Sequence, residues 1–372
     1  MKLGSSASTL RGDSADLQSR ENVFPNVFRG ASATRSILYL GSASLTSLHR
    51  TRALMRLGYA VEVIDPHGLL PRHKAVSSWN HHTGALLSHR IARSRILGAI
   101  GGRRFDLVWV DGGDLVSPEL VRDLKKCAEA VVNYSIDDPF GNRDGLKWRL
   151  YRQSVREYDL VAVVRAENVA EAHRAGAKAV LRVYMSFDEV AHAGRELTES
   201  DRANWKSEVL FVGTWMPERG PFLARLIQLG VPLTIRGDRW NRAKEWPQLK
   251  LAWRSTGVLG DDYARAIQCA KVSLCLLSKG NRDLHTTRSM EIPALNGLLC
   301  AERTREHEDL YLEDEEAVFW SSADECAEKC SYLLRNEAVR RRIANRGHAR
   351  ALANQISNQC VMAAIIEAAS NR

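Results

Sequence analysis

The feature that most constrains this fold is an alternation of short apolar runs with segments of helical periodicity, which occurs twice along the chain. Parallel strands need a crossover, usually a helix, so this alternation is typical of parallel sheets covered by helices. The first series predicts strands at Ser36–Leu40, Ala60–Ile64, Leu107–Val110, Ala130–Tyr134, Leu160–Val164 and Ala179–Tyr184. The second predicts strands at Glu208–Val212, Leu233–Ile235, Val272–Leu277, Leu298–Ala301 and Val318–Trp320. The sequence therefore predicts an α/β protein with two Rossmann-like, doubly wound domains.

The length of 372 residues is too great for one ordinary α/β core and also favours two domains. Residues 1–35, rich in Ser, Arg, Asn and Asp, predict a flexible leader. We assign the first domain to 36–190, a polar linker to 191–207, the second domain to 208–345, and a C-terminal helical segment to 346–372. Ligands of such sheets bind beyond the carboxyl ends of the strands, so we expect the two domains to face each other across a cleft.

The formal net charge of +9 favours anionic partners without choosing among nucleic acid, anionic lipid and a nucleotide diphosphate. Basic residues are not interleaved with aromatic residues as stacking platforms, so nucleic-acid binding is not expected. Seven scattered cysteines, several in apolar runs, predict buried free thiols and a reducing compartment. Cys326 and Cys330 lie four apart on a predicted helix, but no second Cys or His pair has zinc-ligand spacing, so no metal site is predicted.

The strongest local signal for a binding site is the segment from Asp283 to Gly297, which follows a predicted buried strand and opens a helix. Free N–H groups at a helix start suit a phosphate, and the side chains that would assist them are His285, Thr286, Thr287 and Arg288. Glu291 follows one turn later, within reach of a ribose. In the alternative interpretation these residues have structural roles only. Asp283 caps the helix, Arg288 and Glu291 form a surface ion pair, and His285 is a loop residue whose hydrogen bonds are met within the protein.

A second candidate site is the turn that follows the strand Glu208–Val212. Gly213 lets the chain turn sharply, and Arg219 at the next helix start offers a fork of donors that can hold a diphosphate. The alternative is a solvated arginine in an ordinary strand-to-helix turn.

Together these segments resemble a known family. Residues 208–352 are similar to the donor-binding domain of GT-B glycosyltransferases, especially the branch named after a spore-maturation protein and related to family 4, the group 1 glycosyl transferases. Family 4 has two glutamates separated by seven residues and followed by a stretch of small residues that ends in glycine. Asp283 and Glu291 have that spacing, and Ile-Pro-Ala-Leu-Asn-Gly follows.

The resemblance implies a role for each matching position. Glu291 matches the acid that binds the ribose hydroxyls, and Asp283 matches the acid near the transferred sugar. Arg219 falls where the family has a basic residue that neutralises the leaving diphosphate. Thr214 replaces a second basic residue of the family, and the segment 284–287 replaces its glycine-rich loop, so Arg288 or His285 is expected to supply the missing positive charge.

The first domain matches the family more weakly. Gly41 and Ser42, at the end of the first strand, are similar to the glycine turn of GT-B acceptor domains, and the segment 134–139 resembles one in the spore-maturation branch. A carboxylate there could engage an acceptor hydroxyl, with Asp138 the first choice and Asp137 the second. The alternative is an acidic pair that caps a turn before proline. The motif Asp-Gly-Gly-Asp at 111–114 is a further acceptor-side candidate.

The missing motifs narrow the choice of function. A G-x-G-x-x-G fingerprint, a Walker loop, H-E-x-x-H and D-x-D are all absent from the sequence, so we expect a reaction that needs neither cofactor nor metal. The sequence thus predicts a glycosyltransferase that uses a nucleotide-diphosphate sugar, with retention implied by the family. Its acceptor would be a glycan, a lipid-linked molecule or a small molecule. A nucleotide-sugar epimerase or hydrolase and a silent nucleotide-sugar-binding module are the alternatives.

The location of the protein is expected to be cytoplasmic, because the leader lacks the unbroken apolar core of a secretory signal and the thiols favour a reducing compartment. The longest apolar runs also fall far short of the roughly 20 residues that span a bilayer. A helix predicted over Leu86–Arg104 has an apolar face flanked by arginines and could lie on the inner, anionic membrane surface. The alternative is a helix that packs on the sheet and exposes its basic face to solvent.

Overall fold

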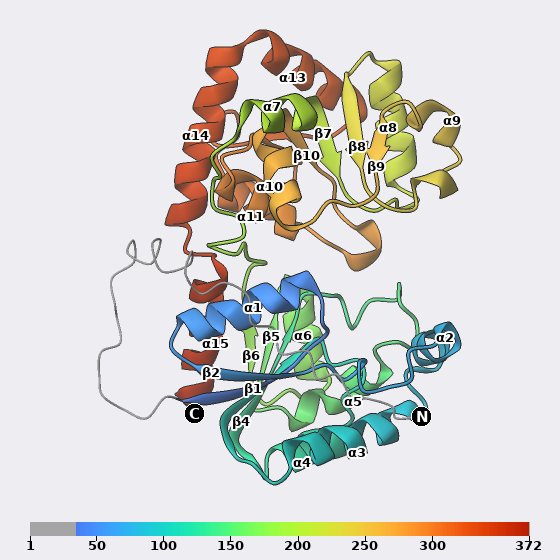
Figure 1. The fold of residues 1–372 in the computed structure, drawn as a ribbon, viewed down its shortest axis with the longest axis vertical. Helices are drawn as coiled ribbons and strands as arrows, with labels where there is room; N and C mark the ends of the chain where they lie inside the picture. The colour runs from blue at the N-terminus through green and yellow to red at the C-terminus, as the bar shows by residue number, and fades with distance from the viewer. Residues whose placement is uncertain (1–34, 372) are drawn as a thin grey trace, which may run out of the picture. The chain divides into compact units, whose positions relative to one another are not determined.

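The computed structural model describes residues 35–371, so the predicted leader lies outside the described residues apart from Arg35. Within this range the chain forms two parallel six-stranded sheets, one in each of two lobes (Figure 1). This architecture confirms the predicted α/β class with two doubly wound domains.

The first sheet has the strand order β2-β1-β3-β4-β5-β6. Its strands are β1 Ser36–Leu40, β2 Ala60–Ile64, β3 Phe105–Asp111, β4 Ala128–Ser135, β5 Leu160–Val163 and β6 Val180–Arg182. Successive side chains of β1 enter opposite faces, because the side-chain period of a strand is two. Ile37 and Tyr39 therefore join one apolar cluster, and Leu38 and Leu40 join the other.

Six helices between residues 45 and 174 accompany this sheet. They are α1 Leu45–Arg56, α2 Lys74–Thr83, α3 Ser88–Ile100, α4 Pro118–Leu124, α5 Arg149–Ser154 and α6 Ala166–Arg174. Their ends follow the local sequence: the Ser44 hydroxyl caps α1 by accepting from the Ser47 N–H, and α2 ends at Gly84 in the left-handed region that glycine favours. Helices α3 and α4 pack on one face of the sheet, and α1 packs on the other.

The second sheet has the strand order β12-β11-β10-β7-β8-β9. Its strands are β7 Ser207–Val212, β8 Leu233–Arg236, β9 Trp253–Ser255, β10 Ala270–Cys275, β11 Leu299–Glu302 and β12 Val318–Trp320. The accompanying helices are α7 Glu199–Trp205, α8 Arg219–Gln228, α9 Trp246–Leu249, α10 Gly260–Gln268, α11 Thr287–Ala294, α12 Arg305–Leu310 and α13 Ala323–Arg335. Helices α8 and α13 cover one face, while α10 and α11 cover the other.

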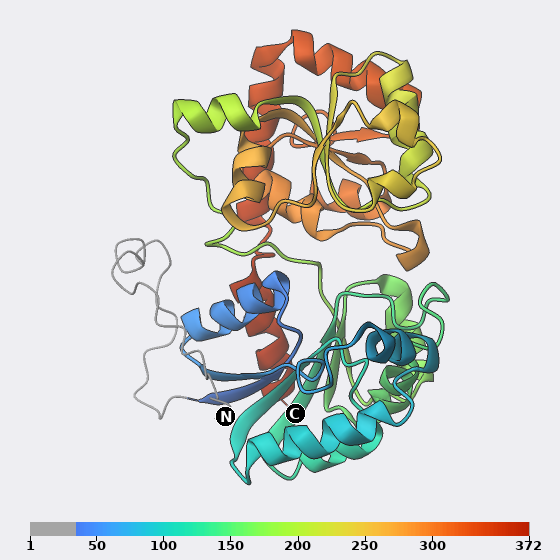
Figure 2. The ribbon, with the colours of Figure 1, turned by 45° about the vertical axis from the view of Figure 1, so that its right-hand side comes forward.

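The C-terminal segment returns to the first lobe. Helix α14 (Glu337–Ala353) packs in the second lobe, and α15 (Asn358–Ser370) buries Met362 and Ile365 in the first-lobe cluster that contains Ile37 and Tyr39. Figure 2 shows this red segment passing from one lobe to the other. The first lobe is thus completed by residues that follow the second lobe in sequence.

Two observed helices differ from the expected domain divisions. Helix α7 occupies part of the stretch 191–207 that the sequence predicts as an irregular linker, because Thr198 and Asp201 exchange hydrogen bonds as a capping box. Helix α14 runs through the predicted division at 345/346. No helix within residues 35–371 combines the length and the apolar character needed to cross a bilayer.

Candidate functional site

Each sheet has one point at which its strand order reverses, and the candidate residues gather there. The reversal lies between β1 and β3 in the first sheet and between β7 and β10 in the second. In open α/β sheets the strand-to-helix loops separate at such a point and leave a crevice for a ligand.

In the second lobe, Arg219 spans the β7/β10 reversal. Its Nη1 donates to the Thr214 carbonyl at 2.8 Å, and its Nη2 donates to the Leu276 carbonyl at 3.1 Å. The side chain is 8% exposed, its Nε has no hydrogen-bond partner among the described residues, and no carboxylate in residues 35–371 forms an ion pair with it. Burial, assisted by the nearby Arg288, lowers the pKa of Arg219 to about 10. This is a fixed, buried cation without a counterion.

Arg288 adds a second positive charge at the same strand ends. Its Nε donates to the Val212 carbonyl at 2.6 Å, and within the described chain it too lacks a carboxylate partner. It lies in the first turn of α11, whose leading N–H groups have no partner within the helix. Thr286 and Thr287, which precede it, are half-buried at this helix start. The arrangement places two guanidinium groups and the positive end of a helix dipole at the same strand ends.

Gly213 and Thr214 shape the turn that holds Arg219. A Cβ at Gly213 would lie 2.8 Å from the Phe211 ring and 3.3 Å from Nη1 of Arg219. Thr214 contributes its backbone carbonyl to the Arg219 guanidinium. Glycine is therefore required here by close packing, and Thr214 acts on the candidate site through its main chain.

A buried hydrogen-bond chain fixes the loop before α11. The His307 Nδ1 lies 2.7 Å from the Glu302 carbonyl and must donate to it, which leaves Nε2 to accept from the Ser289 hydroxyl at 2.7 Å. The Ser289 oxygen in turn accepts from the Thr286 N–H at 3.1 Å. Burial lowers the pKa of His307 to about 4, so the ring stays neutral and keeps this direction of donation.

Glu291 lies one turn further along α11 and is held by a neighbouring helix. Its Oε2 accepts from the Tyr263 hydroxyl at 2.8 Å, and its Oε1 lies 3.7 Å from Nε2 of His192. The residue is half-buried, so one carboxylate oxygen is oriented while the other retains capacity for a ligand hydroxyl.

His285 differs from its predicted role as a phosphate ligand. Its Nδ1 pairs with Glu306, and its Nε2 accepts from the Met185 N–H at 3.0 Å. Both ring nitrogens are thus engaged in a buried contact with other elements, and neither is free to bind a phosphate. The alternative stated above, a satisfied loop histidine, describes this residue.

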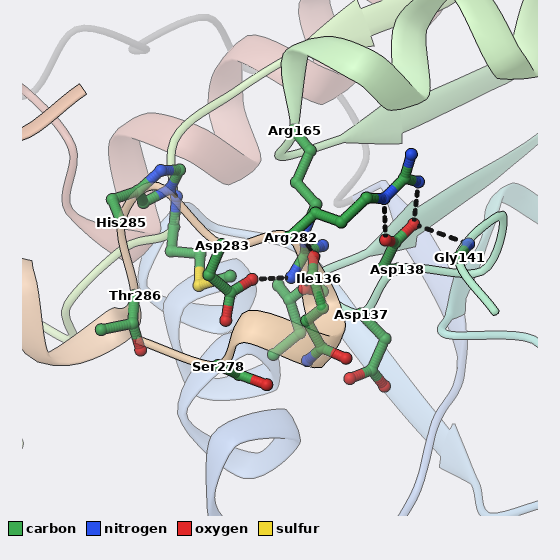
Figure 3. A network of polar contacts seen from close by, with 12 residues as sticks. Ile136, Asp137, Asp138, Gly141, Arg165, Ser278, Arg282, Asp283, His285 and Thr286 are labelled. Atoms are coloured by element: carbon green, nitrogen blue, oxygen red, sulfur yellow. Dashed lines mark hydrogen bonds and ion pairs between the residues drawn. The ribbon is translucent and has the colours of Figure 1, made fainter. Parts of the chain in front are cut away.

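Asp283 is paired with an arginine of the first lobe. Its Oδ1 accepts from Arg165, whose Nη1 also donates to the Ile136 carbonyl at 2.9 Å (Figure 3). Burial raises the pKa of Asp283, and the Arg165 guanidinium opposes that shift. Arg165 occupies one oxygen, and no described residue donates to the other from a side chain.

Asp138 does not have the geometry of the predicted acceptor base. It accepts hydrogen bonds from Arg282 at 2.6 and 2.8 Å and from the Gly141 N–H at 3.0 Å (Figure 3). Asn168 donates to the same carboxylate at 2.9 Å. Burial raises its pKa, but the contacts with Arg282 and Asn168 outweigh burial, and the pKa lies below its ordinary value. A carboxylate so well satisfied is a poor proton acceptor, which corrects the first choice made from the sequence.

The first-lobe reversal contains a cavity of about 440 Å³. Gly41, Ser42 and Asp137 line it, together with Asp111 and Asp114 of the motif after β3. Asp138 is not part of the lining, and in Figure 3 the Asp137 carboxylate points away from Arg282. The structure therefore brings the three acceptor-side candidate segments together and leaves Asp138 outside the cavity lining.

All seven cysteines are free thiols, but three of them meet in the second core. The sulfurs of Cys300, Cys326 and Cys330 lie within 4.8 Å of one another, all buried. Cys300 comes from β11, so spacing along the chain could not reveal it. A structural zinc site normally has four ligands, and no fourth His, Cys, Asp or Glu of the described chain joins this group.

The comparisons with known proteins agree with this arrangement. Residues 219–367 match a protein-family model described as glycosyl transferase-like. A comparison with curated proteins found no match to the chain. The match begins at Arg219 and includes α11, so it covers the donor-side candidates from Arg219 onward but not Gly213 and Thr214.

Several solved structures share the fold at low sequence identity. Sucrose-phosphate synthase from Thermosynechococcus elongatus superposes with a TM-score of 0.65 and 11% identity, over 90% of this chain and 98% of that chain. HepE from Anabaena, solved with UDP-glucose, gives 0.63 and 12%, over 91% and 100%. A glycosyltransferase from Rickettsia africae gives 0.62 and 10%, over 91% and 99%. These likenesses confirm the GT-B fold predicted from the sequence.

Proposed function

We propose that this glycosyltransferase-like protein transfers a sugar from a nucleotide-diphosphate sugar to an acceptor bound by its first lobe. The observation that carries the proposal is the buried Arg219 without a counterion, beside Arg288, at the β7/β10 reversal. Burying a charge without a partner is costly, so such a group is expected where an anionic ligand completes the site. A diphosphate matches two guanidinium forks and a helix start.

In the proposed reaction, the donor lobe stabilises charge as the bond to the diphosphate breaks. Arg219, Arg288 and the backbone N–H groups of Thr287 and Arg288 would hold the leaving diphosphate, so that protein cations supply the charge and no metal is needed. Glu291 would accept hydrogen bonds from the ribose. Asp283 would orient the transferred sugar through the oxygen that Arg165 leaves free.

Two further features of the proposal rest on resemblance. HepE was solved with UDP-glucose, which supports a uridine-type donor as the first to be tested. The similarity to family 4 supports retention of the anomeric configuration. Comparing the configuration of the donor and the product by NMR tests this point: retention is expected, and an inverted product would contradict it.

The alternative functions make different predictions for the donor. An epimerase or hydrolase on the same scaffold would consume the donor when no acceptor is present. A silent binding module would bind the donor and never turn it over. We expect the donor to be consumed at an appreciable rate only when an acceptor is added. The rate is measured by incubating the donor and the protein with and without a cell extract and separating the nucleotide products by chromatography.

We propose a cytoplasmic location with a contact to the anionic membrane surface. Helix α3 buries Ala92, Ile96 and Ile100 on the sheet, and Arg93 pairs with Asp123, as the solvated-face alternative expects. Three apolar side chains at its start remain exposed, Leu86, Leu87 and Ile91. Co-sedimentation with vesicles of anionic lipid is expected, and equal binding of a variant with serine at all three positions would contradict insertion.

The most economical test of the proposed function is a panel of nucleoside diphosphates. A ligand present at 100 times its Kd adds about 2.7 kcal/mol to the stability of the folded state. We expect one of UDP, GDP and ADP to raise the melting temperature more than its monophosphate does. If no diphosphate shifts the melting temperature, the proposed donor site is wrong.

A further inference from the structure

Three cysteines of the second lobe, here called the thiol trio, meet at one point of its core. Cys300 lies on β11, and Cys326 and Cys330 lie one turn apart on α13. Residues four apart share one face of a helix, and this face of α13 packs on the sheet. The three sulfurs lie within 4.8 Å of one another, and each residue is 0% exposed. Two elements of the fold thus bring three thiols together in a space closed to solvent.

The other buried and half-buried cysteines are placed differently. Cys127 donates to a backbone carbonyl at 3.1 Å, Cys269 does so at 3.8 Å, and Cys275 lies 3.6 Å from a serine hydroxyl. Within residues 35–371 the thiol trio has no such oxygen partner. A buried cysteine that packs only as a small apolar group needs no second thiol beside it. Three sulfurs around one point are instead the donor set of a soft, thiophilic ion.

The number of ligands limits which soft ion fits. Zinc in a structural site takes four ligands. No fourth His, Cys, Asp or Glu of the described chain joins the thiol trio, and the complete burial of the three residues leaves no open path for a water ligand. The site therefore suits an ion that is satisfied by three sulfurs.

The charge of the filled site limits the choice further. Metal ions bind the thiolate form, so three ligands bring three negative charges into an apolar cluster that includes Val318 and Leu333. The basic side chains nearest in sequence, Arg303 and Lys329, are paired with glutamates. A monovalent ion would leave two negative charges uncompensated and a divalent ion would leave one, which is costly in a buried site. Only a trivalent ion makes the complex neutral.

The spacing of the sulfurs agrees with three-coordination. A thiolate sulfur lies at about 2.3 Å from a bound ion such as zinc, so three sulfurs around one ion of similar size are no more than about 4 Å apart. The observed sulfurs lie within 4.8 Å of one another. The thiol trio therefore needs only a small inward movement to enclose an ion.

We propose that the thiol trio binds one trivalent, thiophilic ion of the arsenic(III) class as a neutral, three-coordinate complex. Arsenous acid carries three hydroxyl groups on arsenic. Each As–O bond is replaced by an As–S bond, and each thiol proton leaves with a hydroxyl group as water. Arsenic stays trivalent, so the exchange needs neither an oxidant nor a reductant. The bound ion joins β11 to α13 and stabilises the folded second lobe relative to the unfolded chain.

The test uses the full chain with its thiols reduced, and arsenite as the probe. Because the thiol trio is closed to solvent, arsenite enters when the lobe opens locally. The protein is therefore incubated with arsenite both in buffer and in urea below the unfolding transition. Native mass spectrometry is expected to show one arsenic per chain with the loss of three hydrogens, and the melting temperature is expected to rise. Absence of both effects in both solutions overturns the proposal.

X-ray absorption at the arsenic edge counts the ligands directly. Three sulfur neighbours and no oxygen neighbour are expected, and two sulfurs with one oxygen would contradict the three-coordinate site. Zinc is the comparison ion, because it would lack a fourth ligand and leave one charge uncompensated. At equal concentration zinc is expected to raise the melting temperature less than arsenite does. A larger rise with zinc would overturn the choice of a trivalent ion.

Alanine variants locate the ion. Cys326→Ala and Cys330→Ala each leave two thiols and are expected to weaken arsenite binding at least about 100-fold, because loss of a ligand costs more than loss of a group behind one. The melting temperature without arsenite shows that each variant is folded, and two variants are used so that one can fail to fold. Wild-type affinity in a folded variant would place the ion elsewhere.

Two controls keep the thiol trio and remove other cysteines. Cys275→Ala removes a buried thiol outside the trio and is the matched control. The second control removes the exposed and half-buried thiols together, as Cys127→Ser, Cys269→Ser and Cys360→Ser in one chain. Both are expected to bind one arsenic with wild-type affinity. Loss of binding in the second control would show that surface thiols hold the arsenic and would overturn the assignment.

Discussion

Arg282 binds Asp138 through two hydrogen bonds of 2.6 and 2.8 Å, although the two residues are 144 positions apart and belong to different lobes. The same guanidinium donates to both oxygens of Glu171 at 2.9 Å. These hydrogen bonds hold the pKa of Arg282 above its ordinary value. The contact explains why Asp138 has a structural role here, although the segment 134–139 that contains it resembles a segment of the family.

Replacing Arg282 with methionine should destabilise the protein. The Asp138 carboxylate is almost fully buried and would lose its main cationic partner, at a cost of about 2 kcal/mol after allowance for the partial exposure of Arg282. The measurement is the free energy of unfolding from urea denaturation. Arg225→Met is the matched control, because its pair with Asp324 is exposed and should contribute much less to stability. Equal losses in the two variants would contradict a special role for the buried pair.

The buried His307 predicts a pH dependence of stability. Its pKa in the folded state, about 4, lies below the value of roughly 6.5 expected for the unfolded chain. The unfolded state therefore binds more protons at intermediate pH. The contribution of His307 to the stability of the folded state is complete above roughly pH 6.5 and is lost as the pH falls towards the folded-state pKa.

Between pH 7 and pH 5 the free energy of unfolding is expected to fall by about 2 kcal/mol more in the wild type than in His307→Gln. Urea midpoints of both proteins at the two pH values give this difference. Parallel slopes for wild type and variant would show that His307 is not the group responsible.

Removal of the Glu291 carboxylate should weaken the binding only of nucleotides that have ribose hydroxyls. A hydrogen bond to a charged group contributes about 1.5–3 kcal/mol, so Glu291→Ala should weaken the binding of the preferred diphosphate by about tenfold or more. The 2′,3′-dideoxy form should bind wild type and variant alike. Titration calorimetry with both ligands provides the comparison, and equal weakening for the two would place Glu291 away from the ribose.

The sequence predicted the sheets well because each strand carries its own local signal. The apolar runs at Ser36–Leu40 and Ala60–Ile64 coincide with β1 and β2. It missed β9, Trp253–Ser255, because this strand carries Arg254 and Ser255 and forms no apolar run, unlike the equally short β12. The strand ends, and with them the turns at Gly41 and Gly213, followed directly from the strands.

Side-chain pairing could not be predicted in the same way. Whether His285 is free depends on Glu306 and on the Met185 N–H, which lies 100 positions away, and the burial of Asp138 depends on Arg282. Such partners are set by tertiary packing.

The central claim is that Arg219 is held ready for a diphosphate, and calorimetric titration of Arg219→Met tests it most directly. The variant removes a buried charge without a counterion, so the stability of the ligand-free protein should change by no more than about 1 kcal/mol. Affinity for the diphosphate should fall at least about 30-fold, while affinity for the monophosphate changes little. The exposed Arg225→Met should bind as the wild type does. Wild-type affinity of Arg219→Met for UDP, GDP and ADP alike would contradict the account.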